Sequence, residues 1–353
     1  MATKKVLARK NNKSGAKKTS AKKRVRVSAK SPRRETVAVT APLLLRAARQ
    51  AEVAWRRAGQ LYVEKATEFE VARIAQLEAE RELAVFYAQE AKREQRPFQN
   101  FLAQGDSWFS YACGFALIGW LQARFGSQNA YFDNIAVSGR TLRQMLSRQF
   151  KDKLAAGPPN GQPWTAILIS GGGNDICGDY RFRDWLKPYD GTDHPPDWYV
   201  TSAFDREAEI LQGIYEEMIH LVGRTSRVFA HDYDFAIPDG RCVTGRSPRL
   251  ERSLHLCFAG PWMWPAFEER GFHKPGEPIS QLSKDIVTTI LKRFADMLAG
   301  LEQRYPNQFA LVRTQGTLKP IQDVNLWDNE LHPYDSSFRV LAQPFYEKLR
   351  AFL

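Results

Sequence analysis

The chain has 353 residues, of which 43% are hydrophobic and 12% aromatic, enough to bury a substantial core in one large domain or two. Its longest apolar runs fall far short of the roughly 20 residues that cross a bilayer, and no apolar segment follows the basic N-terminus. We therefore expect neither a transmembrane helix nor a secretory signal peptide. The formal net charge of +12 is concentrated in residues 1–34, which hold 14 of the 51 Lys and Arg residues and no acidic residue. The rest of the chain has 37 basic and 39 acidic side chains, so it is close to neutral.

Four cysteines bear on the redox compartment. Cys113, Cys177, Cys242 and Cys257 form no CxxC pair and show no metal-ligand spacing. They predict reduced thiols in a cytoplasmic protein, with a Cys242–Cys257 disulfide as the alternative.

Residues 1–41 form a tail rich in Lys, Arg, Ala and Ser, which we expect to be disordered because like charges repel and few residues could form a core. Basic arms of this kind bind nucleic acid or other polyanions by releasing counterions. A solubilising tail and an organelle transit peptide are the alternatives. Nothing in the tail is suited to reading a base sequence.

Residues 42–96 predict one long amphipathic helix, since no proline and a single glycine interrupt the segment after Pro42. Positions taken alternately every four and every three residues are mostly apolar, and charged side chains fill the other faces. This coiled-coil-like seam includes Leu83 and Phe86. It predicts either a homo-oligomer formed through the helix or a helix packed on the domain that follows.

Strands and helices alternate over residues 97–353. Five apolar stretches predict strands: Phe98–Gln104, Ala130–Gly139, Thr165–Asp175, Ser226–Phe235 and Phe309–Gly316. The segments between them predict helices over Trp108–Phe125, Thr141–Phe150, Phe204–Val222 and Lys284–Tyr305. Strands joined by helical crossovers predict a three-layer α/β/α domain with a five-stranded parallel sheet. In such domains ligands bind at the carboxyl ends of the strands.

Two segments of this domain depart from the alternation. Residues 179–200 and 238–278 are rich in Trp, Tyr, Pro and Arg. Long apolar loops more often cover a site than extend into water. We expect each segment to form a lid or a pocket wall. Their aromatic side chains are compatible with a lipid, a thioester or an acetylated sugar as the ligand.

Four short motifs follow one another along this domain. They are Gly105–Trp108, Asn134–Gly139, Gly171–Asp175 and Trp327–Pro333, read as GDSW, NIAVSG, GGGND and WDNELHP. In this order they resemble the SGNH (GDSL-type) hydrolase superfamily, named for a Ser, a Gly, an Asn and a His in four separated blocks. The resemblance covers roughly residues 98–353, and the order of the four motifs is far more specific than any one of them.

The resemblance implies a flavodoxin-like α/β/α fold and a serine hydrolase that cleaves an ester or thioester through an acyl-enzyme, with no metal or organic cofactor. Ser107 would be the nucleophile, and His332 the general base, since imidazole titrates near neutral pH. The oxyanion would be bound by the backbone N–H groups of Ser107 and Gly139 and by the side-chain amide of Asn174. Glycine suits position 139 because the backbone must approach the substrate closely.

One position departs from the family pattern, which has an Asp three residues before the His. This chain has Asn329 there, with Asp328 one residue earlier. An asparagine can accept the Nδ1–H of a histidine but carries no charge to stabilise the imidazolium. Because one residue of offset turns a side chain to another face, we expect Asn329 to face His332 with its amide held by a neighbour. Asp328 is expected to point elsewhere, as an N-cap of the final helix.

Each of these residues also has a plainer interpretation. Ser107 could be a helix N-cap, and Gly171–Gly173 a phosphate loop that lacks the usual Lys-Ser/Thr. Asp106 and Asp175 could be metal ligands, although we expect them to bind backbone N–H groups and hold their loops. His332 could merely start the last helix, and His231, after the fourth strand, is expected to be a pocket wall.

A different class of function remains as the alternative to catalysis. The protein could be a scaffold or polyanion-binding protein in which the hydrolase-like domain serves only for interaction. The enzyme is favoured because a domain that had lost its catalytic function would be expected to lack at least one of the four residues. All four are present: Ser107, Gly139, Asn174 and His332.

Overall fold

The computed structural model describes residues 75–111, 116–243, 260–274 and 276–353. The expectations for the tail and for residues 42–74 of the long helix lie outside the described residues. So do parts of the segment 238–278.

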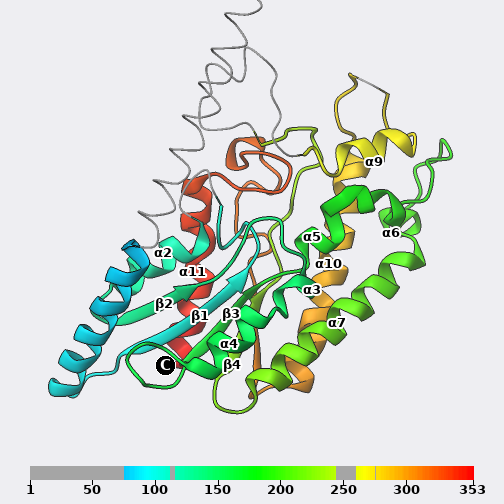
Figure 1. Cartoon of the computed structure of the whole chain (residues 1–353). Coiled ribbons are helices and arrows are strands. Elements are labelled where there is room, and N and C mark those ends of the chain that lie inside the picture. Colours follow the sequence, from blue (N-terminus) through cyan, green and yellow to red (C-terminus); the bar gives the residue numbers. More distant parts are fainter. Residues whose placement is uncertain (1–74, 112–115, 244–259, 275) are drawn as a thin grey trace, which may run out of the picture. The chain divides into compact units, whose positions relative to one another are not determined.

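A five-stranded parallel sheet forms the centre of the domain (Figure 1). Its strands are β1 (Gln99–Gly105), β2 (Ala130–Asn134), β3 (Ala166–Ser170), β4 (Arg227–His231) and β5 (Phe309–Val312). They lie in the order β2-β1-β3-β4-β5, and every neighbouring pair is parallel. All five residues of β3 are buried, as expected for an apolar strand covered on both faces.

Helices cover both faces of the sheet (Figure 1). One layer contains α2 (Leu117–Phe125) and α11 (Asp335–Phe352), and the other contains α3 (Leu142–Met145), α7 (Ser202–Val222) and α10 (Gln281–Arg304). Shorter helices lie in the connections: α4 (Arg148–Ala156), α5 (Gly173–Cys177), η1 (Gly178–Trp185), α6 (Pro196–Tyr199), α9 (Trp264–Glu269) and η2 (Val324–Leu326). The expected three-layer α/β/α architecture is confirmed.

The long helices owe their stability to apolar side chains spaced three and four residues apart. In α7 the buried side chains include Phe204, Leu211, Tyr215, Met218 and Val222, and in α10 the same spacing buries residues from Ile286 to Leu301. Each fully buried large side chain contributes about 1.5–3 kcal/mol, so these two faces hold one helical layer on the sheet.

The sheet topology creates a natural binding position. The chain goes from β1 outward to β2, then returns past β1 to β3. Because the direction of the crossovers reverses there, a crevice opens at the carboxyl ends of β1 and β3. Ser107 follows β1 and Asn174 follows β3, so both lie at this reversal.

Several expected boundaries were wrong. The helix expected from Trp108 starts only at Leu117 in the described chain, and Ser107 lies in a turn. The expected helix over residues 141–150 is two helices, because Ser147 accepts the N–H of Phe150 and caps a new one. Strands β2, β3, β4 and β5 all end earlier than expected, because their last predicted residues lie in turns, in α5 or in irregular chain.

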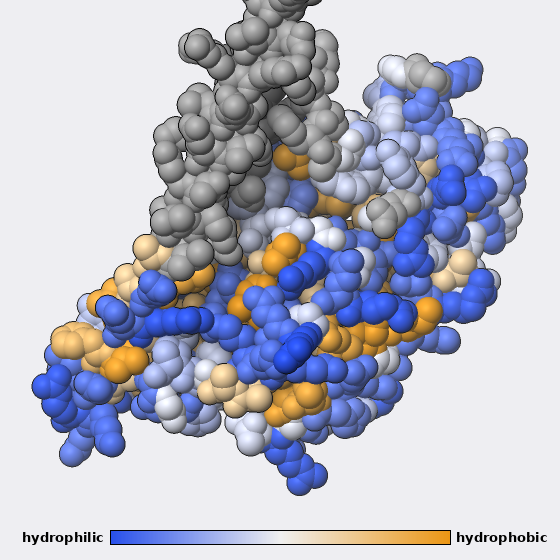
Figure 2. Space-filling model, viewed as in Figure 1, coloured by the Kyte–Doolittle hydropathy of each residue, from blue (hydrophilic) through white to orange (hydrophobic). Residues whose placement is uncertain are grey.

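Residues 75–93 are helical, and their buried face differs from the expected seam. Ala84, Ala88 and Ala91 are buried in the core, whereas Leu83 and Phe86 are 46% and 49% exposed. Apolar side chains are visible on the outer face of this helix in Figure 2. The described part of the helix therefore packs on the domain through small alanines, and the seam predicted through Leu83 and Phe86 is wrong for that contact.

The cysteines divide into two kinds in the described chain. Cys177 is a free, buried thiol, and burial raises its pKa. Cys242 is disulfide-bonded, so the alternative of a bridge at this residue holds over the expectation of reduced thiols. None of the helices within the described ranges combines the length and apolarity that a bilayer crossing requires.

Candidate active site

Ser107 is presented by a tight turn at the end of β1. The carboxylate of Asp106 accepts the N–H of Trp108 at 3.0 Å, and its backbone carbonyl accepts the N–H groups of Phe109 and Ser110 at 3.2 and 3.1 Å. Asp106 thus satisfies the donors of the turn that an N-cap would satisfy. The interpretation of Ser107 as an N-cap is wrong, and its hydroxyl is left for another partner.

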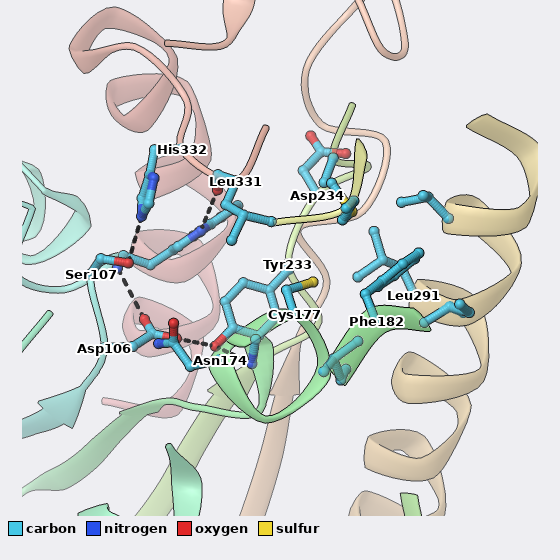
Figure 3. Close-up of a pocket in the computed structure, with 17 residues that line it drawn as sticks. Asp106, Ser107, Asn174, Cys177, Phe182, Tyr233, Asp234, Leu291, Leu331 and His332 are labelled. Carbon is cyan, nitrogen blue, oxygen red and sulfur yellow. Dashed lines mark hydrogen bonds between the residues drawn. The ribbon is translucent and has the colours of Figure 1, made fainter. Parts of the chain in front are cut away.

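That partner is His332 (Figure 3). Its Nε2 lies 2.6 Å from Ser107 Oγ, and its Nδ1 lies 2.8 Å from Asn329 Oδ1. These residues lie far apart in the sequence. Ser107 follows β1, and the loop before α11 carries Asn329 and His332. The structure therefore aligns a hydroxyl, an imidazole and an amide oxygen in one chain of hydrogen bonds.

The orientation of the Asn329 amide follows from its neighbours. Oδ1 accepts the backbone N–H groups of Leu331 and His332 at 3.0 and 3.1 Å, besides contacting the imidazole. Nδ2 donates to the hydroxyl of Tyr111 at 2.9 Å and to the carboxylate of Asp328 at 3.2 Å. A flipped amide would set NH₂ against N–H donors and oxygen against a carboxylate, so only this orientation is satisfied.

This orientation fixes the tautomer of His332. Because Asn329 Oδ1 can only accept, the ring proton sits on Nδ1, and Nε2 is left as the acceptor for the Ser107 O–H. The ring of Tyr111 stacks on the imidazole at 4.3 Å between centroids and 9° between planes. Burial lowers the pKa of His332 to about 3, so the imidazole is neutral at neutral pH.

Asp328 supports this arrangement from behind. It accepts the Tyr111 hydroxyl at 2.6 Å as well as the Asn329 amide. The expectation that Asn329 faces His332 with its amide held is confirmed. The expected N-cap role of Asp328 is wrong, because α11 begins at Asp335 and its N-cap is Tyr334. For the same reason, His332 does not start the last helix.

Asn174 lies beside Ser107 in the same cavity, at the start of α5 (Figure 3). Its Nδ2 donates to the backbone carbonyl of Arg140 at 3.0 Å, which aims the amide and leaves its second hydrogen for a ligand. Gly139 precedes Arg140 in the turn after β2, with a φ of 81° and open space around it. Gly139 is not among the residues that line the cavity, so its oxyanion role stays a prediction.

A buried polar network underlies the turn that carries Ser107. Tyr233 donates its hydroxyl to Asp106 at 2.5 Å and accepts the N–H of Gly173 at 3.2 Å. Ser170 donates to the other oxygen of Asp106 at 2.7 Å and contacts His231 Nε2 at 2.9 Å. Burial raises the pKa of Asp106 to about 6, against the opposing effect of its hydrogen bonds to Tyr233, Ser170 and Trp108.

His231 lies in that network and not in the cavity wall. The side chain is fully buried, and burial lowers its pKa to about 3. Its Nδ1 accepts the N–H of Tyr233, so Nε2 carries the proton and donates to Ser170. The expected pocket-wall role is wrong for His231, and Tyr233, two residues later, lines the cavity instead.

The remaining motif residues have structural tasks. Asp175 accepts the N–H of Leu142 at 2.7 Å, so it holds a loop as expected. A Cβ on Gly171 would lie 2.5 Å from Leu142, and one on Gly172, at φ 105°, would lie 2.7 Å from Phe294. These glycines let the β3 end pack against helices, which explains them without a phosphate. In the described residues, no group of three His, Cys, Asp or Glu side chains is placed to hold a metal.

Glu330 is a site residue that sequence reasoning missed. It is fully buried next to Asn329, and its carboxylate accepts four backbone N–H groups, from Gly240, Trp262, Met263 and Trp264, at 2.5–3.0 Å. Burial raises the pKa of Glu330 to about 7, partly offset by those hydrogen bonds. The segment before α9 is thereby tied to the loop that carries His332.

The cavity beside Ser107 is mostly apolar. Its polar members are Asp106, Ser107, Asn174, Tyr233, Asp234 and His332, and the other side chains are mainly aliphatic or aromatic. Phe182 and Met263, from the segments at residues 179–200 and 238–278, both line it, while the lid role of those segments stays a prediction.

No protein-family model and no curated protein matches the chain. Solved structures match it at low identity. An acetylxylan esterase from Geobacillus stearothermophilus aligns with 72% of this chain and 94% of its own, at 18% identity and a TM-score of 0.37. A protein from Parabacteroides merdae described as a GDSL-like lipase aligns with 73% of this chain and 97% of its own, at 12% identity and a TM-score of 0.41. An α/β hydrolase enzyme from the metagenome of Lake Arreo, Spain, aligns with 73% of this chain and 97% of its own, at 16% identity and a TM-score of 0.39. At identities and TM-scores this low, what these proteins do is no guide to the function of this chain.

Proposed function

We propose that the protein is a serine hydrolase of the SGNH type that cleaves an ester or thioester through an acyl-enzyme. The observation that carries this proposal is the hydrogen bond of 2.6 Å between Ser107 Oγ and His332 Nε2, with Nδ1 held by Asn329. A serine becomes nucleophilic when an oriented neutral base can accept its proton. A scaffold would have no use for this alignment.

In the first half-reaction Ser107 Oγ attacks the carbonyl carbon while its proton moves to His332 Nε2. The carbonyl π electrons move to the oxygen, and the amide of Asn174, with the backbone N–H groups of Ser107 and Gly139, stabilises the oxyanion. When the tetrahedral intermediate collapses, the bond to the alcohol or thiol breaks, and His332 Nε2–H protonates the leaving atom. The acyl group then remains on Ser107.

In the second half-reaction water takes the place of the serine hydroxyl. His332 accepts a proton from water, the hydroxyl adds to the acyl carbon, and the same oxyanion contacts form. Collapse breaks the bond to Ser107 Oγ, which regains its proton from His332. The products are a carboxylic acid and the regenerated enzyme, so this route consumes only water and the ester.

Asn329 performs part of the work that a carboxylate does in other triads. It orients the imidazole and fixes its tautomer, but it brings no negative charge next to the imidazolium. The carboxylate of Asp328 accepts a hydrogen bond from the Asn329 amide, whose oxygen contacts the imidazole. We infer that Asp328 polarises this amide and so supplies part of the missing electrostatic support.

The test is hydrolysis of p-nitrophenyl butyrate by the full-length protein. Ser107→Ala should lower kcat/KM by about 10³-fold or more, because the nucleophile is lost. Ser110→Ala, three residues along the same turn, is the matched control and should retain activity. Equal loss in both variants, or activity unchanged in Ser107→Ala, would contradict the proposal.

The tail is proposed to bind polyanions. Residues 1–34 carry 14 basic side chains and no acidic one, so they would bind through counterion release.

The cellular location is a separate proposal. The cysteine spacing predicts a cytoplasmic protein, whereas the disulfide at Cys242 favours an oxidising compartment. Counting free thiols in the denatured protein, isolated without reductant, distinguishes four reduced cysteines from a bridged pair.

A further inference from the structure

The cavity beside Ser107 extends well past the reacting groups. Figure 3 shows Ser107 and His332 together at one end, and Phe182 and Leu291 at the other. The residues that line it therefore continue past the catalytic pair to Phe182, in η1, and to Leu291, in α10.

The wall beyond the catalytic pair is apolar. Helices α5, η1 and α10 contribute Ile176, Cys177, Phe182, Val287, Ile290 and Leu291 to it, with Phe182 and Leu291 at the end opposite Ser107 in Figure 3. The Cys177 thiol has a raised pKa because it is buried, so it acts as an apolar surface rather than a nucleophile. No Lys or Arg is among the described residues that line the cavity.

The two carboxylates in the cavity wall are already occupied. Asp106 accepts the hydroxyl groups of Tyr233 and Ser170 and the backbone N–H of Trp108. Asp234 accepts the backbone N–H groups of Phe235, Gly316 and Leu318 at 2.7–2.8 Å. Both carboxylates are therefore engaged in holding the fold, and the rest of the lining beyond the catalytic residues is mainly apolar.

The position of His332 decides which half of the ester enters this space. His332 Nε2–H must protonate the leaving oxygen, so the alcohol lies at the His332 end. The group that reaches Phe182 and Leu291, at the opposite end, is the one attached to the carbonyl carbon (Figure 3). We propose, resting on the hydrolase function above, that this cavity binds an unbranched apolar acyl chain and that α10 limits its length.

A simple energy scale gives the expected selectivity. Each methylene moved from water into an apolar site contributes about 0.8 kcal/mol, which corresponds to about fourfold in kcat/KM. With p-nitrophenol as the constant leaving group, kcat/KM should rise about fourfold per methylene from the acetate upward. It should then fall once the chain meets Val287, Ile290 and Leu291.

Two substitutions at one position test the length limit. Leu291→Phe fills the far end and should shift the optimum to shorter chains. Leu291→Ala opens it and should shift the optimum to longer chains. Asp296→Ala, on the exposed face of the same helix, is the matched control and should leave the profile unchanged.

The outcomes separate this proposal from the hydrolase function. A flat acyl profile, or equal changes for acetate and long chains in the Leu291 variants, would overturn the acyl pocket while leaving the hydrolase intact. A series of acetate esters with lengthening alcohols is the second arm. If rates follow the length of the alcohol and not of the acyl group, the assignment of the cavity is reversed and the proposal is wrong. Absence of any ester hydrolysis would instead remove the hydrolase function itself.

Discussion

At the scale of single residues, the site depends on a pair of neighbours that divide one task. Asn329 contacts the imidazole, while the charge resides on Asp328, one amide away. The carboxylate therefore lies farther from His332 than it would in a Ser-His-Asp triad, and its effect is weaker because Coulomb energy falls with distance.

Exchanging the two residues tests this division. Asn329→Asp alone would bring a second carboxylate to about 3 Å from Asp328, and like charges at that distance repel. We expect the single variant to gain little, whereas Asp328→Asn combined with Asn329→Asp should match or exceed the wild-type kcat. Steady-state kinetics on one short ester measures both. If Asp328→Ala is more damaging than Asn329→Ala, the assignment of Asn329 to His332 fails.

The pH dependence follows from the burial of His332. The imidazole works only when neutral, and its pKa is lowered to about 3, well under the ordinary value near 6.5. The chemical shifts of the His332 ring, followed by NMR from pH 8 to 5, should therefore stay constant and change only as the pH approaches 3. The rate is not the readout, because Asp106 and Glu330, whose pKa values burial raises to about 6 and about 7, titrate in that range. A midpoint near pH 6.5 in the ring shifts would show that the imidazole titrates as an exposed histidine does.

At the scale of elements, Tyr233 joins the ends of three strands. It follows β4, its hydroxyl donates to Asp106 after β1, and it accepts the N–H of Gly173 after β3. Ser107 and Asn174 are the next residues along the chain in each case. One buried hydroxyl therefore links the turn that carries Ser107 to the start of α5, which carries Asn174.

Tyr233→Phe should remove both hydrogen bonds and keep the ring. We expect a loss of about 1–3 kcal/mol in stability, the usual cost of an unpaired buried polar group, and a fall of about tenfold in kcat with KM little changed. Chemical denaturation and steady-state kinetics measure the two effects. Tyr189→Phe, which removes an exposed hydroxyl bound to Asp193, is the control. An unaltered kcat in Tyr233→Phe would leave the residue without a positioning role.

The elements also show what could be predicted from sequence. Apolar strands followed by glycine-containing motifs predicted the parallel sheet and placed Ser107 and Asn174 at strand ends, because strand periodicity and turn chemistry are local. Tyr111 and Tyr233 could not be predicted, since each acts through partners more than 100 residues away that only the fold brings close. The face of the described helix that packs on the domain was not predicted, because its buried side chains are small alanines rather than Leu83 and Phe86; self-association through the seam stays a prediction.

At the scale of the whole molecule, charge and catalysis are assigned to different parts of the chain. Residues 1–34 carry the excess of basic side chains, and the remainder is close to neutral. Deleting residues 1–34 should leave ester hydrolysis unchanged and abolish binding to heparin or DNA at low salt. In the full-length protein that binding should weaken steeply as salt rises, because many counterions are released together. Binding that ignores salt, or survives the deletion, would contradict the assignment.

The central claim is that Ser107 forms a covalent intermediate, and labelling by a fluorophosphonate probe tests it most directly. The serine oxygen displaces fluoride from phosphorus, so the adduct stays on the nucleophile and can be located by mass spectrometry of peptides. We predict one adduct on the peptide containing Ser107, present in Ser110→Ala, absent in Ser107→Ala and strongly reduced in His332→Ala. No adduct on the folded wild-type protein, or an adduct on another residue that persists in Ser107→Ala, would contradict the account.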